Sequence, residues 1–263
     1  MGIRSWLEGY TLYPAPRIGR AALAVQARES EALETRLVAE DGTELYGWWM
    51  RGGNTRAVLY FSGNRSSVGA NPQRYARLRD AGFDILHVNY RGYPGSGGRP
   101  SEPGLRMDAR AAWKEITRVF PPERVLVLGS SLGGGVAMGV ASEFEPGALV
   151  LMNTFHSARR VAYENNPAWL VRGFMVSKLD SSILAPKVTC PTLLLHGEED
   201  DLIHPKHAED LSQCFATAPQ LLFVPGANHR TDLLNHPPAW KAFLEVCAHL
   251  LPEHQLETVP PAT

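Results

Sequence analysis

The stretch RVLVLGSSLGGGVAMGVASEF, residues 124–144, decides the fold class of this 263-residue chain. It opens with a short apolar run of the kind found in strands that are buried on both faces of a parallel sheet. The run passes into GSSLG, which fits the pattern G-x-S-x-G with Ser131 at its centre, and a segment rich in Gly and Ala follows. In that context the motif forms a sharp strand-to-helix turn that exposes the serine at the carboxyl end of the sheet. Ser131 is therefore the predicted nucleophile.

Two alternatives to this interpretation stay open. A short pattern such as G-x-S-x-G also arises by chance, and the turn could carry a serine that does no chemistry. The neighbouring Ser130 lies one position early and would break the spacing to Gly129 and Gly133. Glycine at those two positions leaves room in a tight turn where a side chain would clash.

Outward from this stretch, strand and helix patterns alternate, which predicts an α/β fold with a mostly parallel sheet. Asp41-Gly42 between the first two strands is a hairpin signal, so one edge of the sheet should be antiparallel. We expect eight strands, at residues 33–39, 44–50, 57–61, 83–90, 124–129, 148–152, 192–196 and 220–225. Helices are predicted at 72–81, 101–120, 132–144, 205–215 and 237–251, with Ser101 as an N-cap.

A nucleophilic serine needs a general base and an acid that orients it. After the nucleophile of such a turn, the acid and then the histidine follow in chain order. Asp200 comes just after strand 192–196, with Asp201 as the alternative acid, and His229 follows strand 220–225. The other histidines have simpler interpretations: His87 is expected in the core, and His207 is expected to be solvated.

Acyl transfer creates an oxyanion that is usually held by two backbone N–H groups. One is expected from Leu132, directly after the nucleophile, and the other from Asn64 in the loop after strand 57–61.

The segment 154–187 is the least regular part of the chain, and it forms either helices that cover the sheet or a small lid. Apolar side chains in and beside it could line a substrate pocket, although ordinary core packing is the favoured interpretation. These predicted substrate-binding residues are Phe155, Trp169, Phe174 and Met175.

Composition and charge restrict the partners. Lys and Arg number 26 against 27 Asp and Glu, so there is no basic surplus of the kind that nucleic-acid binding requires. The three cysteines are widely spaced and suit buried positions better than a disulfide or metal site, and no metal or cofactor is implied. No stretch is long and apolar enough for a transmembrane helix, and a cytoplasmic location is expected. Residues 3–10 place apolar side chains on one helical face, which would dock on the protein or contact a membrane surface.

The chain resembles the serine α/β-hydrolase superfamily, and within it the cap-poor group of Bem-type and depalmitoylating hydrolases. The motifs that carry the resemblance are FSGN at 61–64, NYRGYPGSGGRPSEPGLRMDA at 89–109, GSSLGGG at 129–135, HGEEDDLIHP at 196–205 and GANH at 226–229. It implies an α/β-hydrolase fold with no large cap domain. Because the predicted acid and base follow strands of the nucleophile's own sheet, we expect a single domain over 1–252, with an N-terminal extension at 1–30. The residues after 252 lack apolar periodicity, so a flexible tail is expected at 253–263. The resemblance also implies that Arg91 links loops beside the site rather than binding substrate.

These observations predict a serine esterase or thioesterase for a small-molecule or acylated substrate, working through Ser131, His229 and Asp200 and an acyl-enzyme intermediate. Two alternatives remain: a peptidase or amidase of the same fold, and a hydrolase fold that has a binding role without catalysis.

Overall fold

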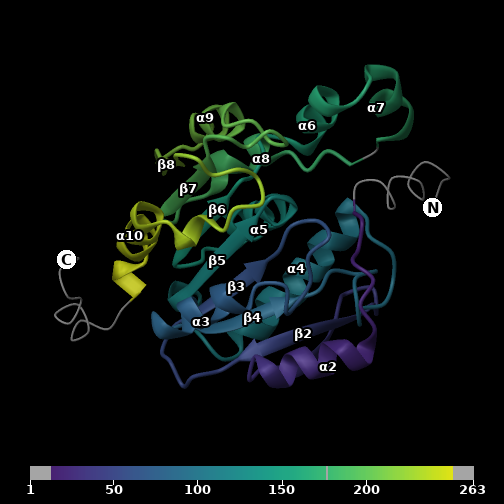
Figure 1. Ribbon diagram of the computed structural model, residues 1–263, viewed down its shortest axis with the longest axis vertical. Coiled ribbons are helices and arrows are strands. Elements are labelled where there is room, and N and C mark those ends of the chain that lie inside the picture. The colour runs from purple at the N-terminus through teal and green to yellow at the C-terminus, as the bar shows by residue number, and fades with distance from the viewer. Residues whose placement is uncertain (1–12, 176, 251–263) are drawn as a thin grey trace.

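A computed structural model describes residues 13–175 and 177–250 of the chain. Its centre is one eight-stranded sheet in the order β1-β2-β4-β3-β5-β6-β7-β8 (Figure 1). β1 pairs antiparallel with β2 and β2 pairs antiparallel with β4, whereas all pairs from β4 to β8 are parallel. The strands are β1 Leu33–Val38, β2 Glu44–Met50, β3 Ala57–Phe61, β4 Asp84–Val88, β5 Val125–Ser130, β6 Ala148–Met152, β7 Thr192–Gly197 and β8 Gln220–Val224.

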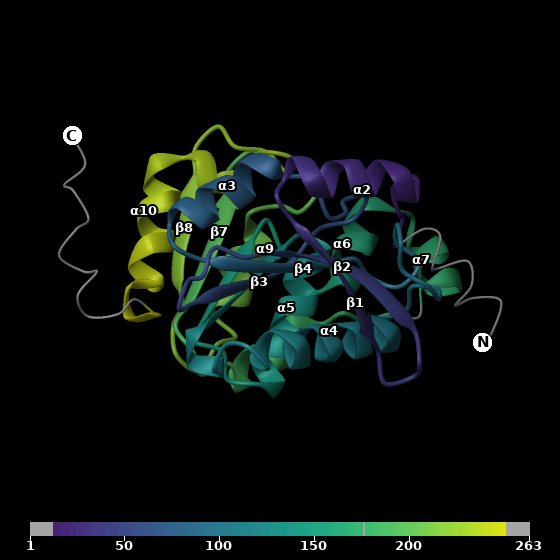
Figure 2. The same ribbon diagram turned by 90° about the horizontal axis from the view of Figure 1, so that it is seen from below.

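Helices cover both faces of this sheet, which is why the central strands β3, β4 and β6 are buried along their whole length (Figure 2). One face packs against α2 Arg20–Glu29, α3 Pro72–Asp80 and α10 Pro237–Val246. The opposite face packs against α4 Glu102–Thr117, α5 Leu132–Glu143 and α9 Lys206–Ser212. In α4 the predicted N-cap is confirmed, because the Ser101 side chain accepts a hydrogen bond from the Gly104 N–H.

The predicted alternation is confirmed, with strand ends displaced by no more than two residues. Helix α2 was not predicted. Within 154–187 the chain forms α6 Ala158–Asn165, α7 Ala168–Phe174, α8 Ser181–Leu184 and the 3₁₀ turn η2 Ala185–Lys187. The remaining 3₁₀ turns are η1 Pro122–Arg124, η3 Leu233–Asn235 and η4 Ala248–Leu250. The described residues form no large cap domain, while residues 3–10 and the tail 253–263 lie outside the described part of the chain.

Because β3, β5, β6, β7 and β8 run parallel, the loops after them meet at one edge of the sheet. In open α/β sheets this carboxyl edge is where ligands bind. The loops that carry Asn64, Ser131, Asp200 and His229 all leave from it. In the described part of the chain, no helix is long and apolar enough to cross a membrane.

Candidate active site

Ser131 occupies a strained turn between β5 and α5. Its φ of 52° and ψ of −118° lie where residues other than glycine are rare, and such strain is often found at functional sites. The flanking glycines make the turn sterically feasible. A Cβ on Gly129 would lie 2.5 Å from the Gly133 carbonyl oxygen, and a Cβ on Gly133 would lie 2.0 Å from the Phe61 carbonyl oxygen. The tight packing predicted for this motif is therefore present.

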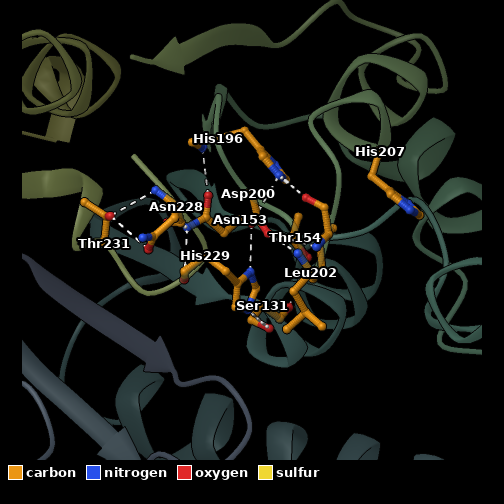
Figure 3. Close-up of polar contacts among 12 residues, drawn as sticks. Ser131, Asn153, Thr154, His196, Asp200, Leu202, His207, Asn228, His229 and Thr231 are labelled. Atoms are coloured by element: carbon orange, nitrogen blue, oxygen red, sulfur yellow. Dashed lines mark hydrogen bonds and ion pairs between the residues drawn. The ribbon is translucent and has the colours of Figure 1, made fainter. Parts of the chain in front are cut away.

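The structure brings Ser131, His229 and Asp200 together from three separate loops (Figure 3). His229 Nε2 lies 3.1 Å from Ser131 Oγ, and His229 Nδ1 lies 2.7 Å from Asp200 Oδ2. Both distances are within hydrogen-bonding range. A chain of contacts thus runs from a buried carboxylate through an imidazole to a hydroxyl.

The loop around Asp200 fixes that carboxylate independently of His229. The backbone N–H groups of Leu202 and Ile203 donate to Asp200 Oδ1 at 3.0 and 2.8 Å. His196 Nε2 lies 2.7 Å from the Ile203 carbonyl oxygen and 3.4 Å from Asp200 Oδ2, so His196 also contacts this loop.

The two neighbouring carboxylates differ sharply in their surroundings. Asp200 is 2% exposed, whereas Asp201 is exposed to solvent. Burial by itself raises the pKa of Asp200, but the hydrogen bonds with His196 and His229 outweigh it and hold the pKa well below its usual range. Asp200 is therefore ionised at neutral pH and can stabilise a positive charge on His229.

Asn153 is a buried residue of the site that the sequence analysis missed. It follows β6 with a φ of 46°, and its side chain bridges two of the three loops. Its Oδ1 accepts a hydrogen bond from the Gly197 N–H at 2.9 Å, on the side of Asp200. Its Nδ2 donates to the carbonyl oxygens of Asn228 and His229 at 3.4 and 3.3 Å. Asn153 thus ties the loop of the carboxylate to the loop of the imidazole.

Ser131 opens onto a cavity of about 200 Å³, which Asn64 and Leu132 also line. Leu132 is the first residue of α5, and the N–H groups of a first helical turn have no acceptor inside the helix. On the other side of Ser131, a Cβ on Gly63 would lie 3.1 Å from Ser131 Cβ, so the β3 loop approaches the serine closely. Asn64 Oδ1 accepts a hydrogen bond from the Tyr93 hydroxyl at 3.1 Å.

Of the four residues predicted to bind substrate, Phe155 lines this cavity. Trp169 is not among the lining residues, and its side chain on α7 is 72% exposed, so the expectation for Trp169 is not met. Met175 is half-buried and does not line the cavity, and the side chain of Phe174 lies outside the described part of the structure. The apolar lining comes mostly from residues whose roles were not predicted: Ala158, Val161, Leu179, Leu202 and Ile203.

The expectation for His207 is also wrong, because His207 is buried and not solvated. Its Nε2 lies 2.7 Å from Glu164 Oε2 on α6, and its Nδ1 accepts a hydrogen bond from the His156 N–H. Burial lowers the pKa of His207, so its neutral form joins α9 to α6. The described residues contain no group of three or more His, Cys, Asp or Glu arranged to hold a metal ion.

Comparison with known proteins finds several similar sequences. Residues 110–230 match the family model for serine hydrolase (FSH1). A Mycobacterium tuberculosis protein described as uncharacterized is 34% identical over 195 residues, which are 72% of this chain and 69% of that protein. The human alpha/beta hydrolase domain-containing protein 17B is 28% identical over 216 residues, or 80% of this chain and 74% of that protein.

Solved structures show the same fold. The Pyrococcus furiosus esterase Pf2001 superposes with a TM-score of 0.72 at 20% identity, covering 90% of this chain and 97% of that one. An α/β hydrolase from Vibrio vulnificus gives 0.73 at 19% identity, covering 95% of this chain and 92% of that one.

The sheet order, the strained serine turn and the loops at the carboxyl edge define an α/β-hydrolase architecture. Together with these relatives, they show that the chain belongs to the α/β-hydrolase superfamily, as the sequence motifs indicated.

Proposed function

We propose that this protein is a serine esterase or thioesterase in which Ser131 is the nucleophile, His229 the general base and Asp200 the orienting acid. The observation that carries the proposal is the pair of contacts at 3.1 Å from His229 to Ser131 and 2.7 Å from His229 to Asp200. Each group lies within reach of the proton that it has to move or stabilise.

In the first half-reaction, Ser131 Oγ attacks the acyl carbonyl carbon while His229 Nε2 takes the hydroxyl proton. The oxyanion of the tetrahedral intermediate is held by the backbone N–H groups of Leu132 and Asn64. His229 then gives the proton to the departing alkoxide or thiolate, and the acyl group stays on Ser131. In the second half-reaction, water loses a proton to His229 and attacks the acyl carbonyl carbon. His229 then returns this proton to Ser131 Oγ as the bond between Oγ and the acyl carbon breaks, which releases the acid and free Ser131. Asp200 remains ionised throughout and stabilises the imidazolium.

The cavity beside Ser131 supports an acyl substrate. Its lining is mainly aliphatic and aromatic, which suits the apolar tail of an acyl group. A thioester and an oxygen ester place the same carbonyl at Ser131, so the site accommodates both leaving groups.

The test is labelling with a fluorophosphonate probe, which reacts with activated serines. We expect wild-type protein to be labelled at Ser131 and the Ser131→Ala variant, folded by circular dichroism, to remain unlabelled. Folded wild-type protein that resists the probe would contradict the proposal and would favour a binding role without catalysis.

Turnover separates ester from amide chemistry. We expect p-nitrophenyl acyl esters to be cleaved and aminoacyl anilides to be cleaved far more slowly. The reason is that departure of the amine from an amide depends more strongly on its protonation by the general acid. Faster cleavage of the anilides would reassign the protein as a peptidase or amidase.

A further inference from the structure

A second cavity lies on the same face of the sheet as the first one. It has a volume of about 220 Å³ and lies among α4, α5 and the segment 179–187. Its inner wall is apolar and includes Val136 and Val140, and its rim carries charged side chains such as Arg106 and Lys187. The contacts described above for Ser131, His229 and Asp200 do not involve it.

Helix α5 connects the two cavities along one face. Leu132, next to the nucleophile, lines the first cavity, and Gly135, Val136 and Gly139 line the second. Positions three, four and seven residues apart share a helical face, so the residues of α5 that line the two cavities lie on one face of the helix. At 1.5 Å per residue, Leu132 and Gly139 are separated by roughly 10 Å along the axis. An acyl chain extended from Ser131 along α5 would point at the second cavity.

Leu179 borders both cavities. Among the described lining residues, it is the one that both cavities share, and it is 6% exposed. Phe155 also borders this region, because its ring lies against Gly135 of α5. A Cβ on Gly135 would lie 2.9 Å from Phe155 Cζ.

The backbone holds Leu179 in place. Its carbonyl oxygen accepts a hydrogen bond from the Ala158 N–H at 3.1 Å, and the adjacent Asp180 forms a β-bridge with Ser157. Leu179 has a φ of 34°, in the left-handed region that a leucine rarely adopts. A strained backbone conformation persists only where the surrounding structure holds it. The hydrogen bond from Ala158 and the β-bridge of Asp180 supply this support for Leu179.

Resting on the proposed function, we propose that Leu179 is the specificity-determining residue that limits acyl length. The first cavity alone, at about 200 Å³, is smaller than the roughly 300–1,000 Å³ of typical ligand sites. Both together exceed 400 Å³ and fall within that range. With Leu179 in place, the enzyme takes short acyl groups; without its side chain, a longer chain continues into the second cavity.

The test is an acyl-length profile of kcat/KM on p-nitrophenyl butyrate, octanoate, dodecanoate and palmitate. Leu179→Gly is the main variant because glycine adopts a positive φ without strain, and Leu179→Ala is the second variant in case the loop loosens. We expect wild type to prefer butyrate, and both variants to raise the dodecanoate-to-butyrate ratio by roughly tenfold or more.

A matched control variant places a larger side chain in the second cavity. A Cβ on Gly139 meets nothing within 4 Å, and leucine has a higher helix propensity than glycine, so Gly139→Leu is expected to fold. Alone it should leave the wild-type profile unchanged, and combined with Leu179→Gly it should abolish the gain on dodecanoate. Wild type that prefers palmitate, or a gain that survives Gly139→Leu, would overturn the proposal.

Binding without turnover separates this proposal from the proposed function. In the Ser131→Ala background, calorimetry with butyrate, octanoate and dodecanoate anions should show tighter dodecanoate binding when Leu179→Gly is added. If the protein hydrolyses no ester yet shows this change, the catalytic proposal fails and the role of Leu179 stands. If esters are cleaved but neither the profile nor the binding changes, the role of Leu179 fails alone.

Discussion

Asn153 holds the loop of His229 through a hydrogen bond from its Nδ2 to the His229 carbonyl oxygen at 3.3 Å, across 76 residues of sequence. The same amide accepts a hydrogen bond from the Gly197 N–H, three residues before Asp200. Its own backbone follows β6, where the Met152 carbonyl oxygen accepts a hydrogen bond from the Ser131 N–H. One short segment therefore contacts all three loops that meet at the site, and its geometry sets the distances among them.

Two substitutions of Asn153 separate its donor from its acceptor. Asn153→Gly keeps the positive φ and removes the whole side chain, while Asn153→Asp keeps the acceptor for Gly197 and loses the donor to the His229 loop. If the amide positions His229, both variants should lose roughly tenfold to a hundredfold in kcat with KM little changed, because small misplacements of a catalytic group are costly.

Thermal unfolding provides the control for this experiment. Asn153→Gly should lower the melting temperature, since a buried N–H is left without its acceptor. Asn153→Asp with full activity would show that the donor to the His229 loop is dispensable. The pH profile of kcat/KM should also move in both variants, which a purely structural role would leave in place.

The choice between the two neighbouring carboxylates gives the next prediction. Asp200→Asn should reduce kcat/KM by roughly 10³–10⁴, because the neutral amide neither stabilises the imidazolium nor fixes the tautomer of His229. Asp201→Asn should stay within about threefold of wild type, since Asp201 is exposed. Initial rates on p-nitrophenyl butyrate decide this, and a larger loss from Asp201→Asn would overturn the assignment of the acid.

Much of this architecture could be predicted because it follows from local sequence. Most of the central strands are predominantly apolar runs, and the serine turn has its two glycines in the required places. Helix α2 escaped prediction because it lacks start signals: its N-cap Gly19 makes no side-chain cap, and only Leu23 and Ala27 are buried. The burial of such a helix depends on the sheet that it covers.

The residues that were missed owe their roles to distant contacts. Asn153 bonds to groups 44 to 76 residues away, and nothing in its own neighbourhood marks it. His207 is buried because α6 lies over α9. Leu179 adopts a positive φ, and a leucine in the sequence gives no indication of that conformation. Conversely, the aromatic character of Trp169 suggested a pocket residue, although its side chain lies at the surface.

The stability of an Arg91 variant distinguishes a role in linking loops from a role in binding substrate. It is 5% exposed, with Nη2 at 2.8 Å from Asp108 Oδ1 on α4 and Nη1 at 2.7 Å from Asp41 Oδ2 in the β1–β2 turn. This agrees with the expected linking of loops. Arg91→Ala removes the guanidinium that pairs with the buried Asp108 and should cost about 3–5 kcal/mol in the free energy of unfolding.

Denaturant unfolding measures this cost, and kcat/KM measured well below the melting temperature should stay near the wild-type value. Asp41→Asn is the control, because the Asp41 side chain is 36% exposed and its loss should cost much less. A variant Arg91→Ala that is stable but inactive would instead assign Arg91 to the substrate.

His87 in β4 should make stability depend on pH in the acid range. It is fully buried, with Nδ1 at 2.8 Å from the Tyr75 hydroxyl, and its Nε2 has no hydrogen-bond partner among the described residues. Burial, with a smaller contribution from the charge of Arg74, lowers the pKa of His87 to about 3. The unfolded chain binds this proton near its ordinary pKa of about 6.5. Between those two values the unfolded state holds one more proton than the folded state, so stability falls as the pH falls.

The expected size of this effect is large enough to measure. At about pH 4.5, protonation of the unfolded chain at His87 alone should remove about 2–3 kcal/mol from the free energy of unfolding. His87→Gln should be less stable than wild type at neutral pH, yet its stability should fall less steeply between about pH 6.5 and pH 4, because glutamine does not titrate. His204→Gln, at an exposed position, should keep the wild-type slope. Parallel slopes for wild type and His87→Gln in urea unfolding across this range would show that His87 is not the group responsible.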